Sequence, residues 1–270
     1  MSTKIIEVIT CIEKMAPLGY QESWDNSGLQ VGDPNQDVKA VLLCVDITEA
    51  TIDEAIAKGV NLIISHHPLI FRGVKKITGK NYIERVIIKA IQNNIVLYSA
   101  HTNMDKCVGG VNFRIAEKLG LKSIAVLVEE ENIINQEQLG LGCIGKLENP
   151  LDEEEVLRLI CSNLQVKYVR HTKLLNRKVS KIALCGGAGS EFISLAIAKG
   201  ADLYITSDVK YHDFFSAENQ IVIVDIGHFE SEQCIKDVFC EQLSKNFINF
   251  AILKADSDKS PVEYYYTIEN

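Results

Sequence analysis

Hydrophobic positions along the chain fall into two patterns, short continuous runs and longer segments with helical spacing. The continuous runs predict buried strands over residues 40–46, 61–65 and 95–100. The helical spacing predicts helices over residues 48–58, 82–92 and 111–119. This order of strands and helices predicts an α/β fold with a mostly parallel sheet covered by helices on both faces.

The second half of the chain repeats this pattern in its letters. A shift of 141 residues places Ala-Ile-Ala-Lys-Gly at 55–59 on the same five residues at 196–200. Ten positions of segment 43–67 are identical under this shift, without a gap. We interpret the repeat as two related α/β halves, and expect 41–65 and 182–206 to form βαβ units with the same strand order.

The repeat divides the chain into a first half over 1–122 and a second half over 123–270. The second half opens with a connecting segment of different texture, 123–175, in which a helix begins at the capping box Asp152-x-x-Glu155. The strands predicted in the second half outside the repeat are 142–147, 166–170, 221–225, 249–254 and 262–268. The sequence leaves open which half the connecting segment and the tail strands join.

Composition narrows the class of protein. A length of 270 residues suits about two domains, and 47% hydrophobic residues is ordinary for a folded chain. The net charge of −8 makes nucleic acid and anionic membranes poor partners. No apolar stretch approaches the roughly 18 residues of a membrane span, and residues 5–15 predict an amphipathic helix rather than a signal peptide. Eight cysteines without a C-x-x-C pair indicate reduced thiols, so we expect a cytoplasmic protein.

Polar clusters rich in histidine follow three of the predicted strands. The clusters are Ser65-His66-His67-Pro68, His101-Thr102-Asn103-Met104-Asp105 and His228-Phe229-Glu230-Ser231-Glu232. They contain four of the six histidines in the chain. Because ligands of doubly wound sheets bind beyond the carboxyl ends of the strands, this placement predicts a functional site.

The residue types in these clusters are typical of metal ligands. His66 and His67 point apart on an extended backbone, so they suit two ions a few ångströms apart. His228 and Glu232 share a helical face, and Asp105 adds a carboxylate. Imidazole and carboxylate without thiolate suit Zn, Fe(II) or Mn. Each residue alone is better explained as a cap or a polar loop residue, but five of them at three strand ends favour metal binding.

Four more polar residues lie near strand ends: Asp46, Asp208, Lys210 and His212. They could orient ligands, move protons or contact phosphate, and Lys210 is equally well explained as a solvated loop residue. The loop 186–189 could hold an anion on its backbone N–H groups, although a tight structural turn explains it better. Trp24 could stack on a base or cover the edge of the core.

The segment Ser-Trp-Asp-Asn-Ser-Gly-Leu-Gln-Val-Gly at 23–32 resembles the N-terminal signature of the NIF3-like proteins, also called the GTP cyclohydrolase I type 2 family. The three histidine clusters and segment 206–213 resemble further motifs of that family. The likeness runs in order and spacing from about Lys4 to the tail. Ser207 departs from the pattern, because the family more often has glycine there.

The resemblance implies five metal ligands: His66, His67, Asp105, His228 and Glu232. It implies that His67 and Asp105 hold one ion, that His66 and His228 hold the other, and that Glu232 bridges the two. It also implies two similar α/β domains with the dinuclear site in the cleft between them. Family members assemble as toroidal homohexamers, and a chain this short has no room for the domain that long members insert.

The family name implies opening of the imidazole ring of GTP by metal-bound hydroxide. We therefore predict a dinuclear metal-dependent hydrolase that acts on a nucleotide or a related phosphoester. His101, His212 and Asp208 are the catalytic candidates, because they follow strand ends without being assigned as ligands. The alternative is a non-catalytic metal-binding protein that acts through protein–protein contacts. An open coordination position would favour the enzyme.

Overall fold

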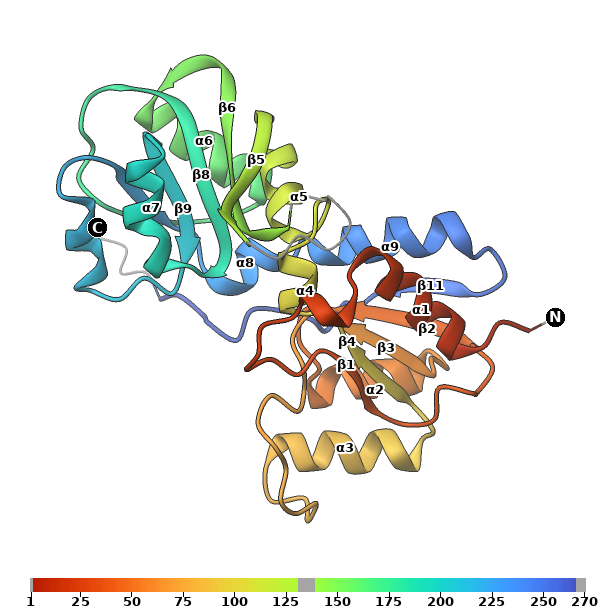
Figure 1. Ribbon diagram of the computed structural model, residues 1–270. Coiled ribbons are helices and arrows are strands. Elements are labelled where there is room, and N and C mark those ends of the chain that lie inside the picture. Colours follow the sequence, from red (N-terminus) through yellow and green to blue (C-terminus); the bar gives the residue numbers. More distant parts are fainter. Residues whose placement is uncertain (1, 131–138, 266–270) are drawn as a thin grey trace.

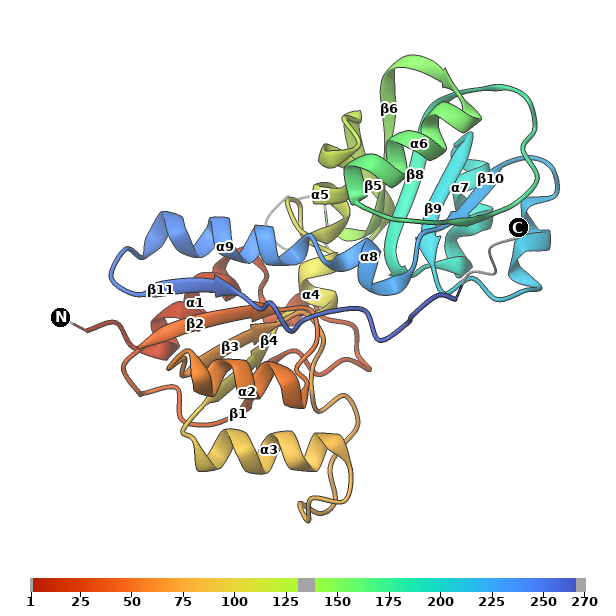
Figure 2. The ribbon, with the colours of Figure 1, turned by 180° about the vertical axis from the view of Figure 1, so that it is seen from behind.

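A computed structural model describes residues 2–130 and 139–265 of the chain. Its strands form two sheets, one of five strands and one of six. The two sheets occupy different halves of the molecule, and the short helices α4 (Thr102–Asp105) and α8 (His228–Glu232) lie where the halves meet (Figures 1 and 2). The α/β fold class predicted from the sequence is confirmed.

The first sheet has the strand order β1-β4-β3-β2-β11. Its strands are β1 (Gly28–Val31), β2 (Ala40–Cys44), β3 (Leu62–Ser65), β4 (Val96–Ser99) and β11 (Ala251–Lys254). The last four run parallel, and β1 pairs antiparallel with β4. All residues of β2, β3 and β4 are buried, as expected for strands that are covered on both faces.

Helices cover both faces of the first sheet: α1 (Ile5–Met15), α2 (Glu49–Ala57), α3 (Tyr82–Gln92) and α9 (Ile235–Asn246). Successive strand residues point to opposite faces, so each strand feeds two cores. Val41 and Leu43 pack in the core that contains α1 and α9. Leu42 packs in the core that contains α2 and α3.

The second sheet has the strand order β5-β6-β8-β9-β10-β7. Its strands are β5 (Lys122–Glu129), β6 (Gly140–Asp152), β7 (Arg170–His171), β8 (Lys178–Ala188), β9 (Leu203–Ser207) and β10 (Val222–Asp225). Only β8, β9 and β10 run parallel, so this sheet is mixed rather than mostly parallel. Its helices are α5 (Val111–Lys118), α6 (Glu153–Leu164) and α7 (Ile193–Ala198), and the 3₁₀ turns of the chain are η1 (Leu18–Tyr20), η2 (Ser190–Phe192) and η3 (Asp213–Ala217).

The repeat in the sequence corresponds to the same ladder in both sheets. Val41 of β2 pairs with Leu62 of β3, and 141 residues later Ile182 of β8 pairs with Leu203 of β9. The next two pairs in each ladder obey the same shift. In both units a helix, α2 or α7, connects the two parallel strands. The expected agreement in strand order therefore extends to the register, which supports an internal duplication.

Local signals predicted the helices well and some strands poorly. The helices expected over 48–58, 82–92 and 111–119 are α2, α3 and α5, with ends shifted by one residue at most. The capping box of α6 is present, with the Asp152 N–H donating to Glu155 Oε2 at 2.8 Å. Of the strand expected over 166–170, only the last residue belongs to β7, because the Val166 N–H completes the end of α6 by donating to the Cys161 carbonyl.

The tail returns to the first sheet, which answers a question that the sequence left open. β11 pairs parallel with β2, although a division of the chain at residue 122 assigns it to the second half. Beyond it, Asp258 accepts hydrogen bonds from the Val45 and Asp46 N–H groups and pairs with Lys236. The strand expected over 262–268 is wrong for 262–265, where the backbone forms no ladder, and its remainder lies outside the described residues. Instead, the ring of Tyr264 packs against Tyr168.

The cysteines and the helices bear on the remaining expectations. All eight cysteines carry free thiols, and six of them are buried. Burial raises the pKa of the most enclosed thiols, such as Cys44 and Cys185, so these thiols stay protonated. Within residues 2–130 and 139–265, no helix is long and apolar enough to cross a membrane.

Candidate metal centre

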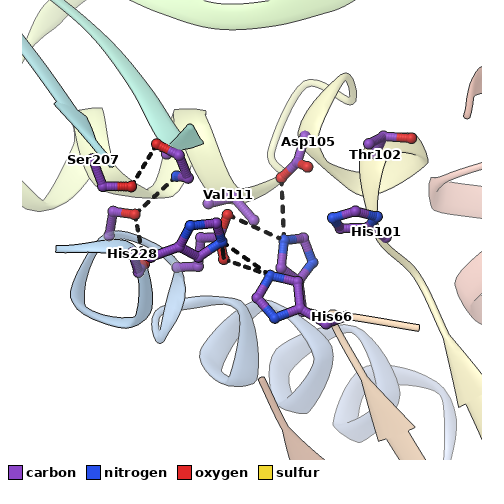
Figure 3. Close-up of polar contacts among 12 residues, drawn as sticks. His66, His101, Thr102, Asp105, Val111, Ser207 and His228 are labelled. Carbon is purple, nitrogen blue, oxygen red and sulfur yellow. Dashed lines mark hydrogen bonds and ion pairs between the residues drawn. The ribbon is translucent and has the colours of Figure 1, made fainter. Parts of the chain in front are cut away.

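The carboxyl ends of β3, β4 and β10 bring the three histidine clusters together where the two halves meet (Figure 3). The residues that carry the site are His66 and His67 after β3, His101 and Asp105 at α4, and His228 and Glu232 at the two ends of α8. The five residues expected to be metal ligands thus converge on one point, although they come from both sheets.

His66 is fully buried and aims one nitrogen at two carboxylates. Its Nδ1 lies 2.9 Å from the Ala100 carbonyl oxygen. A carbonyl can only accept, so Nδ1 carries the hydrogen, and Nε2 of the neutral ring is left as a ligand atom. Nε2 lies 3.4 Å from Asp105 Oδ1 and 3.7 Å from Glu232 Oε1.

His67 and His228 face each other across the second oxygen of Glu232. Their Nε2 atoms are 3.3 Å apart, and they lie 2.9 Å and 3.1 Å from Glu232 Oε2. The Nδ1 atom of each ring contacts a carboxylate, Asp46 at 2.9 Å for His67 and Asp208 at 2.7 Å for His228. A carboxylate behind a ligating histidine fixes the ring and makes Nε2 a better donor.

These separations fit divalent cations. Ligand atoms about 2.0–2.2 Å from a tetrahedral ion are roughly 3.3–3.6 Å apart, close to the separations measured here. Among the described residues, His66 Nε2, Asp105 Oδ1 and Glu232 Oε2 are buried side-chain atoms without a hydrogen bond. Buried polar atoms without partners are costly and need an explanation, which a bound ion would supply. The donors are nitrogen and oxygen, which suits Zn, Fe(II) or Mn.

The charges of the site favour bound protons in the absence of a cation. Burial lowers the pKa of His67, but its hydrogen bonds to Asp46 and Glu232 outweigh burial and raise the pKa to about 10. The pKa of His228 rises to about 11, because bonds to Asp208 and Glu232 outweigh its burial. Burial raises the pKa of Glu232, but the surrounding histidines lower it well below its usual value. A cation would therefore bind in exchange for protons.

The pairing of ligands differs from the one that the family resemblance implied. His66 lies with Asp105, and His67 lies with His228, so the expected partners of the two adjacent histidines are exchanged. The reason is the anchoring of each ring. Asp46 holds Nδ1 of His67 and directs its Nε2 toward α8, whereas the Ala100 carbonyl directs Nε2 of His66 toward α4. The two oxygens of Glu232 face both groups, as a bridging ligand requires.

His101, a predicted catalytic residue, lies beside the cluster. Its ring centroid is 5.2 Å from that of His66 and 5.3 Å from that of His67. Its Nδ1 lies 2.8 Å from Asp25 Oδ1, and the other oxygen of Asp25 accepts from the Thr102 N–H. One nitrogen each of His66, His67 and His101 lie within 4.8 Å of one another, so His101 could also serve as a ligand.

The other two catalytic candidates lie apart from the donors. Asp208 is half-exposed and contacts the cluster only through Nδ1 of His228, so it orients a ligand. His212 is exposed and contacts the rings of Tyr211 and Phe215, outside the cavities that the metal cluster lines. Its placement at the end of β9 misled the prediction, because the chain turns away from the site after Asp208.

The loop 186–189 is a tight turn that supports the site, as the sequence favoured. Gly187 has φ +65°, and a Cβ at this position would lie 2.3 Å from Glu232 Oε1. Its N–H donates to Ser231 Oγ at 2.9 Å, and its carbonyl accepts from Ser207 Oγ at 2.6 Å. Ser207, the departure from the family pattern, therefore ties the end of β9 to this loop.

Sequence reasoning missed Asn112, which is buried in the first turn of α5. Its Nδ2 donates to the Asp105 carbonyl at 3.0 Å, and its Oδ1 accepts from the Gly186 N–H at 2.8 Å. One side chain thus connects the α4 segment to the loop beneath Glu232. The only signal in the sequence was an amide on the apolar side of a helix.

Two cavities open onto the cluster and share Asp46, His67 and His228 as a wall. The aromatic cavity, of about 430 Å³, is the one lined by Trp24, Phe71, Tyr82 and His101. The tail cavity, of about 500 Å³, is the one lined by Arg170, Asp208 and Tyr264. The donors are therefore buried at their base yet reachable by small molecules.

Comparison with known proteins finds relatives over nearly the whole chain. A model of the family described as Duf34/NIF3 (NGG1p interacting factor 3) matches residues 3–261. A "GTP cyclohydrolase 1 type 2 homolog" of Clostridium perfringens is 37% identical over 97% of this chain and 99% of its own length. A protein of the same name from Campylobacter jejuni is 32% identical over 97% of this chain and 100% of its own.

Solved structures agree with the sequence comparisons. A Bacillus cereus protein related to NIF3 matches with a TM-score of 0.89 and 27% identity, over 98% of this chain and 100% of its own. A hypothetical protein of Staphylococcus aureus matches with a TM-score of 0.90 and 30% identity over the same shares. The arrangement of the two sheets is therefore shared with solved proteins.

Proposed function

The chain belongs to the Duf34/NIF3 family, and from that premise we propose that it is a hydrolase dependent on two divalent cations. Its substrate is a nucleotide or a related phosphoester, as the name of its relatives suggests. Among the described residues, the observation that carries the proposal is the convergence of three buried polar atoms without hydrogen bonds, His66 Nε2, Asp105 Oδ1 and Glu232 Oε2.

The donors divide into two sets with one shared residue. His66 and Asp105 would hold the first cation, and His67 and His228 the second. Glu232 would contribute one oxygen to each. Two such cations supply Lewis-acid polarisation of the bond under attack and lower the pKa of water. Three protein ligands per cation leave coordination positions open, which distinguishes a catalytic site from a closed structural one.

His101 is the side chain of this chain best placed to move a proton during the reaction. Asp25 accepts from its Nδ1, which leaves Nε2 to exchange a proton with substrate in the aromatic cavity. Asp25 can stabilise the charged ring, because hydrogen bonds from His101 and Thr102 hold the pKa of this carboxyl far below its usual value against the effect of burial. The same arrangement of carboxylate and imidazole serves many hydrolases.

The experiment compares protein stripped of metal with protein reloaded with Mn²⁺ or Zn²⁺, on a panel of nucleosides and nucleotides, with products followed by mass spectrometry. Turnover should vanish on chelation, return on reloading and be absent in Glu232→Gln. Glu230→Gln, on the same helix but outside the donor set, should keep it. Metal binding without turnover on any compound would favour the alternative of a non-catalytic metal-binding protein.

We also propose that the protein assembles as a closed homohexamer in a reducing compartment such as the cytoplasm. The side chains of Tyr211 and Phe215 at η3 are exposed and in contact with each other, which provides an apolar surface for another subunit. Eight free thiols suit reducing conditions. Light scattering at micromolar concentration should give six times the chain mass, and a monomer would contradict the assembly.

A further inference from the structure

Three large aromatic side chains are exposed at the mouth of the aromatic cavity. Trp24 is 58% exposed, Tyr82 51% and Phe71 46%. They come from three separate segments of the first half, so their gathering is a property of the fold. Exposed aromatic surface beside a cavity is typical of a binding site for a small molecule.

The aromatic rings lead directly to the candidate metal ligands. The centroid of Trp24 lies 5.9 Å from that of Phe71 and 6.2 Å from that of His101, with the rings edge to face. His101 in turn lies 5.2 Å from His66 and 5.3 Å from His67. A planar group that stacks on Trp24 would therefore lie next to the donors.

Hydrogen bonds hold the two exposed rings in place. Asp25, next to Trp24, is tied to α4 through the Thr102 N–H and the His101 ring. Asn26 Nδ2 donates to the Ile70 carbonyl at 2.6 Å, which fixes the segment before Phe71. Both rings thus stand on anchored loops, and a preformed site avoids the cost of ordering them on binding.

The charge of the aromatic cavity disfavours an anionic ligand. Its described lining contains no lysine or arginine but has five carboxylates: Glu22, Asp46, Asp105, Glu191 and Glu232. Two divalent cations would add four positive charges, and Lys106 pairs with Glu22 from outside the lining. The loaded cavity would therefore be close to neutral, which does not match the charge of a triphosphate.

We propose that the aromatic cavity binds an uncharged planar heteroaromatic compound, a nucleobase or nucleoside, stacked against Trp24, in preference to a nucleoside triphosphate. This inference rests on the proposed function only for the site at which the ring would react. Trp24 and Phe71 are then the residues that select a flat ring. Base stacking on an aromatic side chain corresponds to about a tenfold gain in affinity or more.

The chain contains a single tryptophan, so its fluorescence reports on this cavity alone. Titration of Zn²⁺-loaded protein with guanosine should quench Trp24 saturably, ribose should have no effect, and GTP should bind no more tightly than guanosine. In calorimetry, Trp24→Ala should bind guanosine about tenfold more weakly, whereas Trp24→Phe should bind within about threefold of the parent. Tyr211→Ala, an exposed aromatic residue outside the cavity, should bind unchanged.

The inference is overturned if GTP binds more tightly than guanosine, if Trp24→Ala binds with unchanged affinity while its metal content and unfolding temperature are those of the parent, or if Trp24 fluorescence follows protein concentration instead of nucleoside. The proposed function fails separately. Stacking without turnover would remove the hydrolase and keep the site, whereas turnover that is insensitive to Trp24→Ala would keep the hydrolase and remove the site.

Discussion

Helices α4 and α8 carry the same residue types at the same spacing, and the structure uses them differently. His101 and Asp105 lie four residues apart after β4 of the first sheet, and His228 and Glu232 lie four residues apart after β10 of the second. A carboxylate accepts from Nδ1 of each histidine. The difference begins with the acid, because the longer arm of Glu232 reaches both groups of donors, whereas Asp105 reaches His66 alone.

The ends of β3 and β9 show the same division of roles. Under the shift of 141 residues, His66 and His67 correspond to Ser207 and Asp208. The first pair aims ring nitrogens at the centre, whereas the second pair supports it, Ser207 through the Gly187 carbonyl and Asp208 through Nδ1 of a ligand. A repeated scaffold thus supplies ligands from one copy and their supports from the other.

The largest effect should follow from breaking the contrast between Glu232 and Asp105. Glu232→Gln removes the charge that both sets of donors share, so both metals should be lost. Asp105→Asn should weaken mainly the ion held with His66. Elemental analysis after dialysis measures this, with Glu230→Gln as the control. Two metals per chain and unchanged affinity in Glu232→Gln would disprove the bridge.

The contrast between His101 and His228 gives the next effect. His101→Ala should keep both metals and lower turnover by about a hundredfold or more, because it removes a group that moves protons. His228→Ala should lose the metal that it shares with His67. Metal content and turnover are measured on the same samples, with His212→Ala as the control outside the cavities. Loss of a metal in His101→Ala would make His101 a ligand instead.

Gly187 tests whether the second copy must leave room for the bridge. Its counterpart under the shift is Asp46, so this position changes from a support to an empty space. Gly187→Ala should cost about 1 kcal/mol for the positive φ and, through the 2.3 Å approach to Glu232, at least about tenfold in metal affinity. Gly200→Ala, with φ +71° and nothing within 4 Å, should cost stability alone. Equal metal affinities in the two variants would show that Glu232 can move aside.

Much of this arrangement could be predicted because its signals are local. Continuous apolar runs predicted β2, β3 and β4, and helical spacing predicted α2 and α3. The five candidate ligands were predictable because the carboxyl ends of parallel strands share one edge of a sheet, and the structure brings them together. Whether they bind two ions remains a prediction.

The rest depends on contacts between distant segments. The pairing of His66 with Asp105 follows from ring orientations, which the Ala100 carbonyl and Asp46 set across the sheet. The place of the tail in the first sheet depends on hydrogen bonds between residues about 200 positions apart, such as those from the Asp256 and Ser257 N–H groups to Glu54. No local pattern encodes such contacts.

Glu54 carries the smallest difference between the two copies, since its counterpart under the shift is Leu195. Burial raises the pKa of Glu54, but hydrogen bonds from Lys58, Ser257 and the tail N–H groups lower it from 4.5 to about 2. A depressed carboxyl pKa stabilises the fold above the unfolded value, and this contribution disappears as the pH falls through the folded value. Glu54→Gln should therefore lower the unfolding free energy of metal-free protein by about 1–2 kcal/mol at pH 7, and by less than roughly half of that at pH 3. Glu49→Gln, whose carboxylate pairs with Arg85 on the exposed side of the same helix, should cost less than about 0.5 kcal/mol. Urea unfolding at both pH values measures these differences, and an equal loss at pH 7 and pH 3 would mean that the charge of Glu54 does not hold the tail.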